Sequence, residues 1–297
     1  MRERPPITIG LIAAVIIGLA LSVVSYVLVS TIRTQAIGPS LAFSAALLVV
    51  ALSLMGMWAY GLIELLTLHY VVDRNGIVLA TAFARQTIPH AAIQGVVEGE
   101  SASAPSRLRG MTWPGYLRGT FTAEPFGRIS VWATEPLLRQ LVLVTDSGCY
   151  GISPANRGRF LADYAMRRDL GALELIPQEL TPVGVASWSI WHDGLVWVAI
   201  ALSLALDAVL ATLSLARYSA LPAIIPLHWN AQGQADRLAA KSGIFALPAI
   251  GAGVLVLSLV LAIAIHHHER FGARLLAWGS IGIQAALWTA AWQILGT

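Results

Sequence analysis

The sequence predicts an integral membrane bundle of about five transmembrane helices, with a water-exposed β-rich domain inserted between the second and third helices. Three observations support this fold class. Of the 297 residues, 57% are hydrophobic, and the mean hydropathy is +0.70. Only 12% are charged, against about 25% in an ordinary soluble domain. The charged residues are also unevenly distributed, because long stretches lack them while one central stretch has the composition of a soluble protein.

Five stretches are long enough to cross a membrane. A span needs about 20 apolar helical residues, because the hydrocarbon core is about 30 Å thick and a helix rises about 1.5 Å per residue. Four stretches contain no charged residue: Pro5–Ile32, Thr34–Ile63, Ser242–Ile265 and Leu275–Thr297. The fifth, Gly194–Ala216, is interrupted only by Asp207. The first stretch is too long for a signal peptide and has no cleavage site of small residues, so we expect a retained helix.

The spans divide the chain into four parts. We expect two transmembrane helices in residues 5–66, the β-rich domain in 67–182, and helices three and four in 183–265 with a loop at about 217–243 between them. A His-rich turn and the fifth helix occupy 266–297.

Orientation follows from the positions of arginine and lysine. If five spans alternate, one side of the membrane receives Arg2, Arg4, the arginines of the central domain, Arg270 and Arg274. These residues outnumber the basic residues on the other side. Positive residues are enriched in cytoplasmic segments. We therefore expect the N-terminus and the β-rich domain in the cytoplasm and the C-terminus outside.

The central domain has the pattern of a small sheet protein closed by a helix. Asn75-Gly76 lies between two β-rich runs and is a strong hairpin signal, because both central residues of such a turn need positive φ. Ser153 is the expected N-cap of the helix, with Pro154 at its first position. Strands are expected at His69–Val72, Ile77–Phe83, Gln86–Ile88, Ile93–Glu98, Tyr116–Thr122, Arg128–Thr134, Gln140–Thr145 and Cys149–Ile152.

These elements resemble the bacterial pleckstrin-homology (PH) domains that are attached to membrane helices. The resemblance implies a PH-like fold in a bacterial cytoplasmic (inner) membrane and says nothing about the ligand. It is carried by Tyr70-Val71-Val72-Asp73 with Gly76-Ile77, by Ile88-Pro89 with Ile93, by Gly115-Tyr116, and by Tyr150-Gly151-Ile152-Ser153-Pro154 with Phe160-Leu161.

One arginine-containing loop, Pro105 to Gly119, is a candidate interface. Residues 67–182 contain eleven Arg and ten acidic residues, so the net charge of the domain is only +1 and no general lipid-binding cluster is expected. Arg107, Arg109 and Arg118 either bind phosphate or simply lie near the membrane surface. Trp113 and Tyr116 in the same loop either enter the membrane interface or pack on a partner.

The loop between the third and fourth spans holds the most family-specific string of the chain. It resembles the Ile-Pro-x-His-Trp-Asn-x-x-Gly-x-x-Asp loop of a domain of unknown function, which also occurs in membrane immunity and signalling proteins of the bacterial sporulation-delay toxin system. The candidate binding residues are Pro226, His228, Trp229, Asn230, Gly233 and Asp236. His228 and Asp236 are too few for a zinc site, so we expect no metal and a turn closed by hydrogen bonds.

Asp207 and Glu64 are intramembrane polar residues. A carboxylate within a span costs at least about 2.5 kcal/mol on insertion scales, so Asp207 is protonated, paired or facing a polar cavity. It either moves a proton or forms a buried hydrogen bond to another helix. We expect Glu64 with His69, and His192 with Asp193, to clamp the β-rich domain against the bundle.

Two further groups have plain structural interpretations. His266, His267 and His268 point in different directions around a helix, and we expect a solvated interfacial cluster. Cys149, the single cysteine, cannot form an intramolecular disulfide and is expected in the core of the domain, with a reactive thiol as the alternative.

The sequence contains no common catalytic or phosphate-binding motif. We therefore expect a non-enzymatic membrane scaffold, regulator or accessory subunit without a cofactor. Its partners would be the lipid bilayer and either another protein or a second copy of the chain, and not a nucleic acid. The alternatives are an extracytoplasmic sensor or toxin-immunity-type signalling protein, and a proton-coupled transporter that uses Asp207.

Overall fold

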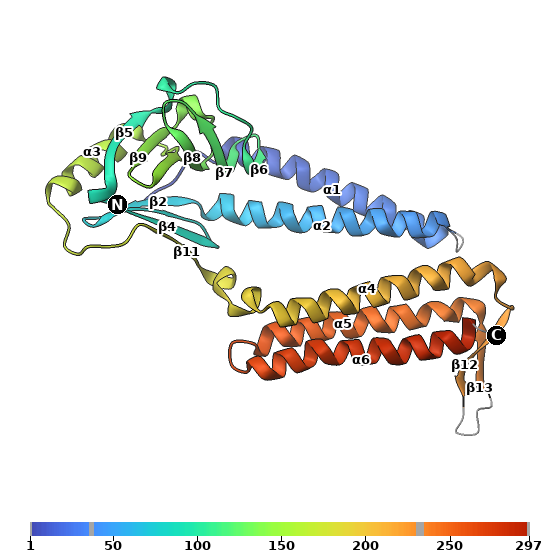
Figure 1. Ribbon diagram of the computed structural model, residues 1–297. Helices are drawn as coiled ribbons and strands as arrows, with labels where there is room; N and C mark the ends of the chain where they lie inside the picture. Colours follow the sequence, from blue (N-terminus) through green and yellow to red (C-terminus); the bar gives the residue numbers. More distant parts are fainter. Residues whose placement is uncertain (1, 36–38, 230–234, 296–297) are drawn as a thin grey trace. The chain divides into compact units, whose positions relative to one another are not determined.

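The computed structural model describes residues 2–35, 39–229 and 235–295 (Figure 1). The chain divides into two compact units. Residues 1–30 and 47–187 form the first unit, and residues 31–46 and 188–297 form the second.

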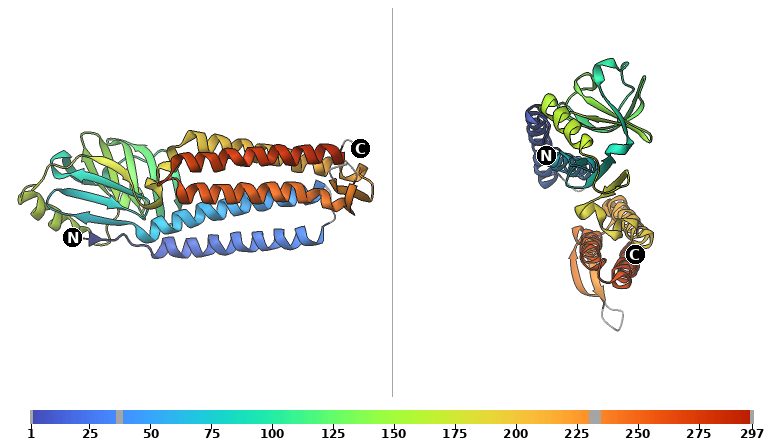
Figure 2. Two further views of the ribbon diagram at one scale, coloured as in Figure 1. Left: turned by 90° about the horizontal axis from the view of Figure 1, so that it is seen from below. Right: turned by 90° about the vertical axis from the view of Figure 1, so that its left-hand side faces the viewer.

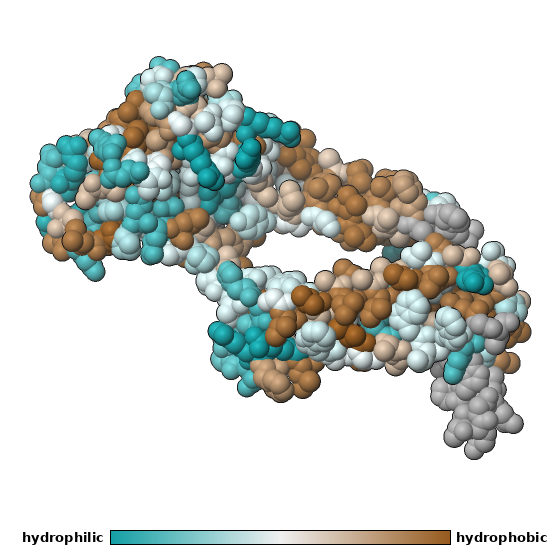
Figure 3. Space-filling model, viewed as in Figure 1, coloured by the Kyte–Doolittle hydropathy of each residue, from teal (hydrophilic) through white to brown (hydrophobic). Residues whose placement is uncertain are grey.

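The described residues form five long helices, which agrees with the predicted number of about five. They are α1 (Thr8–Thr34), α2 (Pro39–Thr67), α4 (Gly194–Arg217), α5 (Ala246–Ile265) and α6 (Arg270–Leu295). Within the described residues, the first four belong to segments long and apolar enough to cross a membrane. Figure 3 shows hydrophobic residues along their outer surfaces, and Leu19 and Val49 are 63% and 64% exposed. Such surfaces are stable only in contact with lipid or with another apolar surface.

Helices α1 and α2 pack through a glycine. Gly18 of α1 lies against the indole of Trp58, and a Cβ at this glycine would lie 2.6 Å from the nearest ring atom. The indole Nε1 of Trp58 donates a 3.0 Å hydrogen bond to the Ala14 carbonyl oxygen. This bond satisfies a polar group that would otherwise be unpaired between apolar helices.

The PH-like domain follows α2 directly and consists of two sheets and the helix α3 (Arg157–Asp169). The first sheet has the order β1-β2-β3-β4-β11, and the second has the order β5-β9-β10-β8-β7-β6. The bounds are β1 (Arg2–Glu3), β2 (His69–Val72), β3 (Gly76–Ala80), β4 (Ala84–Pro89), β5 (Ile93–Glu98), β6 (Arg109–Trp113), β7 (Tyr116–Ala123), β8 (Gly127–Ala133), β9 (Leu141–Thr145), β10 (Gly148–Ile152) and β11 (Glu179–Pro182).

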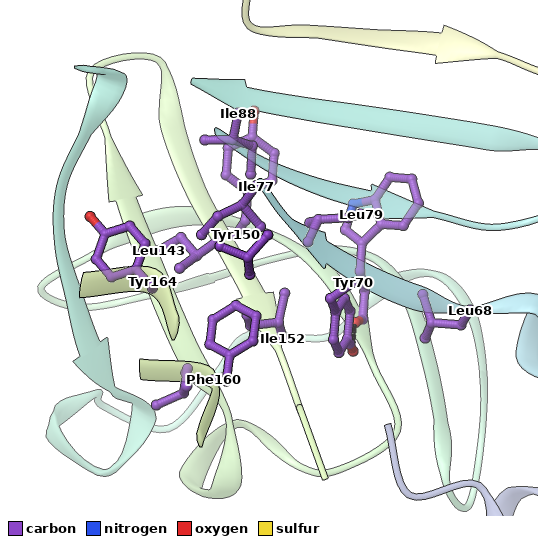
Figure 4. Packing of buried hydrophobic residues seen from close by; sticks show 13 residues of the cluster. Leu68, Tyr70, Ile77, Leu79, Ile88, Leu143, Tyr150, Ile152, Phe160 and Tyr164 are labelled. Atoms are coloured by element: carbon purple, nitrogen blue, oxygen red, sulfur yellow. Dashed lines mark hydrogen bonds between the residues drawn. The ribbon is translucent and has the colours of Figure 1, made fainter. Parts of the chain in front are cut away.

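The main core lies between the two sheets and α3 (Figure 4). Tyr70 of β2 and Phe160 of α3 meet edge to face, with 6.5 Å between their ring centroids. The Tyr70 hydroxyl donates a 2.6 Å hydrogen bond to the Trp132 carbonyl oxygen and accepts one from the Ser153 backbone amide. The two sheets and the helix are thereby joined through one buried side chain.

Three details differ from the sequence-based expectations. The predicted N-cap was wrong: Asn156 caps α3 by accepting a hydrogen bond from the Arg159 amide. Ser153 instead accepts a 2.9 Å hydrogen bond from the Thr134 amide, so its side chain is not free to cap a helix. The predicted loop from Pro105 to Gly119 contains the strand β6, which pairs with β7. Strands β1 and β11 were also not predicted.

Cys149 is 6% exposed, as expected for a core residue. Its Sγ lies 3.4 Å from the Phe126 carbonyl oxygen, and burial raises the pKa of its thiol. The reactive-thiol alternative is therefore not supported.

In the second unit, α4, α5 and α6 lie side by side (Figure 2). The Ser203 and Ser280 hydroxyls are 2.7 Å apart, and the Trp288 indole donates a hydrogen bond to the Leu206 carbonyl oxygen. Both contacts join α4 to α6. In the sequence, α4 and α5 are connected by the hairpin of β12 (Ile224–Trp229) and β13 (Ala235–Ala240).

Candidate functional site

A hydrogen-bonded polar cluster of the first unit surrounds Glu64, in the last turn of α2. Its carboxylate is buried, at 1% exposure. One oxygen accepts a 2.9 Å hydrogen bond from the Thr81 hydroxyl, and the other accepts a 2.8 Å hydrogen bond from the Tyr116 hydroxyl. The Arg118 Nε lies 3.6 Å from the second oxygen. We call Glu64, Thr81, Tyr116 and Arg118 the docking cluster.

Arg118 connects the docking cluster to the domain core. Its guanidinium carbon lies 3.3 Å from the ring centroid of Trp132, which is 1% exposed. A cation over an indole face is attracted by the ring, most strongly where water is excluded. Burial lowers the pKa of Arg118 from its ordinary value, and the Glu64 charge opposes this change. Arg118 keeps its positive charge, because arginine stays protonated in proteins.

Tyr116 acts as a neutral donor in this cluster. Burial, and after it the negative charge of Glu64, raises the pKa of its hydroxyl above the ordinary value. Both carboxylate oxygens of Glu64 therefore have hydrogen-bond partners, and the charge has a counterion. This arrangement fixes the end of α2 to the domain.

Apolar contacts surround the docking cluster. Tyr60 of α2 stacks on Phe83 with 4.7 Å between ring centroids. Met111 and Trp113 of β6 cover Gly61, where a Cβ would lie 2.4 Å from the Met111 sulfur. These contacts hold the β6–β7 hairpin against the side of α2.

The tip of the same hairpin also meets α1. A Cβ at Gly10 would lie 2.5 Å from the Gly115 carbonyl oxygen, so the backbones touch directly. Gly115 has φ +80, a left-handed conformation that favours glycine. Both membrane helices of the first unit thus contact one hairpin of the domain.

The structure separates the predicted interface residues into two groups. Glu64, Trp113, Tyr116 and Arg118 come together at the helix ends, as the clamp hypothesis for Glu64 requires. Arg107 and Arg109 do not share this environment: they line a separate polar pocket of about 370 Å³ with Arg128. Arg118 points toward Glu64, so the three loop arginines do not form one group.

Thr81, Trp132 and Arg128 were missed as site residues. Thr81 is 17 positions from Glu64, and no local pattern of the sequence joins the two. Trp132 of β8 pairs with Arg118 of β7, and this register is not visible in the sequence.

Asp207 is buried in α4 and accepts a 3.3 Å hydrogen bond from the Gln284 side chain of α6. Gly251 of α5 provides the space, since a Cβ there would lie 2.1 Å from an Asp207 oxygen. The carboxyl group is therefore in contact with two other helices. This is the interhelical hydrogen bond that the sequence left as one of two possibilities.

Asp193 joins the start of α4 to the turn between α5 and α6. Its carboxylate lies 2.9 Å from the His266 Nε2 and 3.0 Å from the Arg274 Nε. The predicted solvated histidine cluster was wrong for His266, which is 2% exposed and also lies 3.2 Å from the Ser189 hydroxyl. Asp193 therefore braces the helix bundle itself.

The predicted outer loop is a hairpin at its base. Pro226 and His228 of β12 pair with Leu238 and Arg237 of β13, and Trp229 pairs with Ala235. Asp236 lies in β13. The predicted residues Asn230 and Gly233 lie outside the described residues. In the described part of the chain, no group of three or more His, Cys, Asp or Glu side chains is placed to hold a metal ion.

The fold and the docking cluster define the class: a membrane protein with a PH-like domain joined directly to its membrane helices. Residues 68–168 match the family described as bacterial PH domain, and residues 208–252 match a domain of unknown function (DUF1648). The fusion of these two domains agrees with the resemblance seen in the sequence. No curated protein and no solved structure matches the chain significantly.

Proposed function

We propose that this protein is a non-enzymatic membrane scaffold or accessory subunit whose PH-like domain binds a protein partner. The observation that carries the proposal is an apolar surface at the C-terminal end of α3. It consists of Met166, Leu170, Leu173 and Leu175, which are 54%, 58%, 72% and 90% exposed. We call it the leucine surface.

The leucine surface is held in place by hydrogen bonds. The Asn75 side-chain oxygen accepts bonds from the Leu173 and Glu174 amides, at 2.9 and 3.1 Å. Arg74 donates a 3.0 Å bond to the Leu170 carbonyl oxygen. Exposed leucines on a segment fixed in this way form a preorganised binding surface, which lowers the entropy cost of association.

The bilayer does not account for this surface. In Figure 1, α3 lies at the end of the domain away from α1 and α2, and the docking cluster fixes the domain to α2. The leucine surface therefore faces away from the membrane that the helices occupy. A protein with a complementary apolar patch is the occupant that suits it.

The test compares a double variant with a single-substitution control in the full chain. L173E/L175E places two charges on the leucine surface, while the control L138E alters another exposed leucine of the domain, at 59% exposure. Proteins that crosslink to the wild type and to L138E in native membranes, and are lost with L173E/L175E, support the proposal. An identical crosslinking profile for all three forms contradicts it. Crosslinks only between copies of the chain would show self-association.

We also propose that the N-terminus and the PH-like domain face the cytoplasm, and that the C-terminus lies outside. The arginine distribution supports this orientation. Since the native Cys149 is buried, an introduced cysteine at an exposed site reports the topology. We expect E100C to react with a membrane-impermeant thiol reagent in inside-out vesicles and not in right-side-out vesicles. The reverse pattern would invert the topology.

A sensor role is the second candidate, because the outer hairpin is coupled to the helix bundle. Ile225 of β12 packs in one buried cluster with Ile244 and with Ile294 of α6. A ligand that moves the hairpin at His228 would therefore also displace α6. Loss of an extracellular response in H228A and D236A, with the protein still folded, would support this role over the scaffold.

A further inference from the structure

Residues of β6 line two cavities of opposite character, both within the first unit. The first is the polar pocket of about 370 Å³, lined by Arg107, Arg109 and Arg128 together with Ser106 and Thr120–Thr122. The second is an apolar groove of about 360 Å³, lined by residues 110–113 and by Ile17, Leu21, Leu54, Met57 and Trp58.

The polar pocket carries three positive charges without a counterion. Its lining contains no carboxylate, and no guanidinium of the three forms an ion pair or hydrogen bond within the described residues. The Ser106 hydroxyl accepts a 2.8 Å hydrogen bond from the Thr122 amide, and the Ser106 amide donates to the Thr122 carbonyl oxygen. These bonds hold the segment that contains Arg107 beside β7. The fold therefore brings the three arginine charges close together.

The apolar groove lies at the depth of the hydrocarbon core. Helix α1 has 27 residues and α2 has 29, or about 40 and 43 Å, which exceeds the core of about 30 Å by about 10 to 13 Å. Leu21 lies 13 residues from the start of α1, and Leu54 lies 13 residues from the end of α2, about 20 Å in each case. Even if all of the extra helix length protrudes from the hydrocarbon core on the side of the domain, both residues remain inside the core.

Strand β6 lines this groove and lies beside the parts of α1 and α2 that are nearest the domain. Figure 1 shows β6 and β7 beside the first part of α1, and the contacts of Gly10 and Gly61 with this hairpin agree. Arg109 of the polar pocket directly precedes Gly110 of the apolar groove, so the two cavities adjoin. The positive pocket suits an anionic headgroup, and the apolar groove suits a hydrocarbon chain. One amphipathic molecule could therefore occupy both.

We propose that this site binds an anionic phospholipid of the leaflet that faces the PH-like domain. Arg107, Arg109 and Arg128 bind the phosphate, and an acyl chain occupies the groove between Leu21, Leu54 and Met111. The site would fix the position of the hairpin on the bilayer surface. It is independent of the leucine surface, which lies at the other end of the domain.

The charge arm of the test measures lipid retention by the purified full chain in detergent. Native mass spectrometry counts bound phosphatidylglycerol and phosphatidylcholine for the wild type, for R107Q/R109Q/R128Q, and for the control R85Q/R139Q/R159Q, which removes the same charge from other exposed sites of the domain. Each arginine near anionic lipid contributes roughly five-fold in affinity, so the first triple variant should lose on the order of 100-fold. The control should bind phosphatidylglycerol like the wild type. Equal loss in both triple variants, or equal retention of both lipids by the wild type, would overturn the proposal.

The apolar arm separates a lipid from a soluble phosphate. L21W narrows the groove, and L19W places the same side chain on an outer position of α1 that is 63% exposed. We expect weaker phosphatidylglycerol binding in L21W alone, and no displacement of the lipid by millimolar inorganic phosphate. Displacement by phosphate, or unchanged binding in L21W, would indicate a soluble anion and reject the lipid. Equal thermal stability of L21W and L19W excludes misfolding as the cause.

Discussion

The Tyr116 hydroxyl donates a 2.8 Å hydrogen bond to the carboxylate of Glu64, across 52 positions of the sequence. Glu64 ends a membrane helix, and Tyr116 begins a strand of the PH-like domain. With Arg118 at 3.6 Å from the same oxygen, this contact joins the helix to the domain. A motion of α2 would therefore be transmitted to the domain.

We expect E64A to release the domain from α2. Removing one member of a buried ion pair leaves the other uncompensated and costs about 3 to 5 kcal/mol, whereas Y116F removes only one hydrogen bond and should cost about 1 to 2 kcal/mol. Hydrogen–deuterium exchange of β7 and of the last turn of α2 measures the effect. The control is E98A, which alters an exposed carboxylate of the same domain. Protection of β7 in E64A equal to that in E98A would show that the docking cluster does not hold the interface.

Local patterns predicted the elements of this site but not their pairing. The apolar runs located the spans, Asn75-Gly76 located a hairpin, and Glu64 was recognised as a charge at a helix end. Its partners Thr81, Tyr116 and Arg118 lie 17, 52 and 54 positions away, and only the register of the sheets brings them to one place.

The Ser153 N-cap failed for a related reason. The sequence Ser-Pro is a good local start for a helix, but the Ser153 hydroxyl is bound by the Thr134 amide in the sheet. The helix therefore begins after Asn156, the next residue with a suitable side chain. A tertiary hydrogen bond that fixes the donor or acceptor of a capping side chain is not visible in the sequence.

Helix α5 provides a matched pair of glycines that tests the role of Asp207. G251A should weaken the packing of α4, α5 and α6, because the new Cβ would lie 2.1 Å from the Asp207 carboxylate and 2.8 Å from the Gln284 amide nitrogen. G253A meets nothing within 4 Å and should be neutral or stabilising by up to about 1 kcal/mol through helix propensity. Thermal unfolding in detergent compares the two variants. Equal unfolding temperatures would mean that Asp207 has room to move.

D207N separates the scaffold from the carrier hypothesis. An asparagine keeps an acceptor for the Gln284 side chain, so the bundle should remain folded and partner crosslinking should be unchanged under the scaffold hypothesis. A proton carrier would lose its activity, because the amide cannot take up and release a proton. Proton flux into liposomes that contain the wild type but not D207N would contradict the scaffold assignment.

Acidification should weaken the second unit through Asp193. Burial alone would raise the pKa of this carboxyl group, but the hydrogen bonds from His266 and Arg274 lower it below the ordinary value of 3.8. A group with a lowered pKa in the folded state stabilises the fold above its ordinary pKa and loses this effect as pH falls through the lowered value. We expect the unfolding temperature of the wild type to fall below about pH 4 relative to that of D193N. Parallel curves for the two proteins would exclude a contribution from this ion pair.

The contact between Gly115 and Gly10 can be tested against a second glycine with a similar backbone. Gly115 and Gly127 have φ +80 and +66, so an alanine at either position is strained by a similar amount, about 1 kcal/mol. Only at Gly115 would the Cβ meet the backbone of α1, at 2.3 Å from the Gly10 amide nitrogen, while nothing lies within 4 Å at Gly127. We therefore expect G115A to destabilise the first unit more than G127A and to increase hydrogen exchange in the first turns of α1. If the two variants unfold alike, the hairpin tip is not held by α1, and the docking cluster alone joins the domain to its helices.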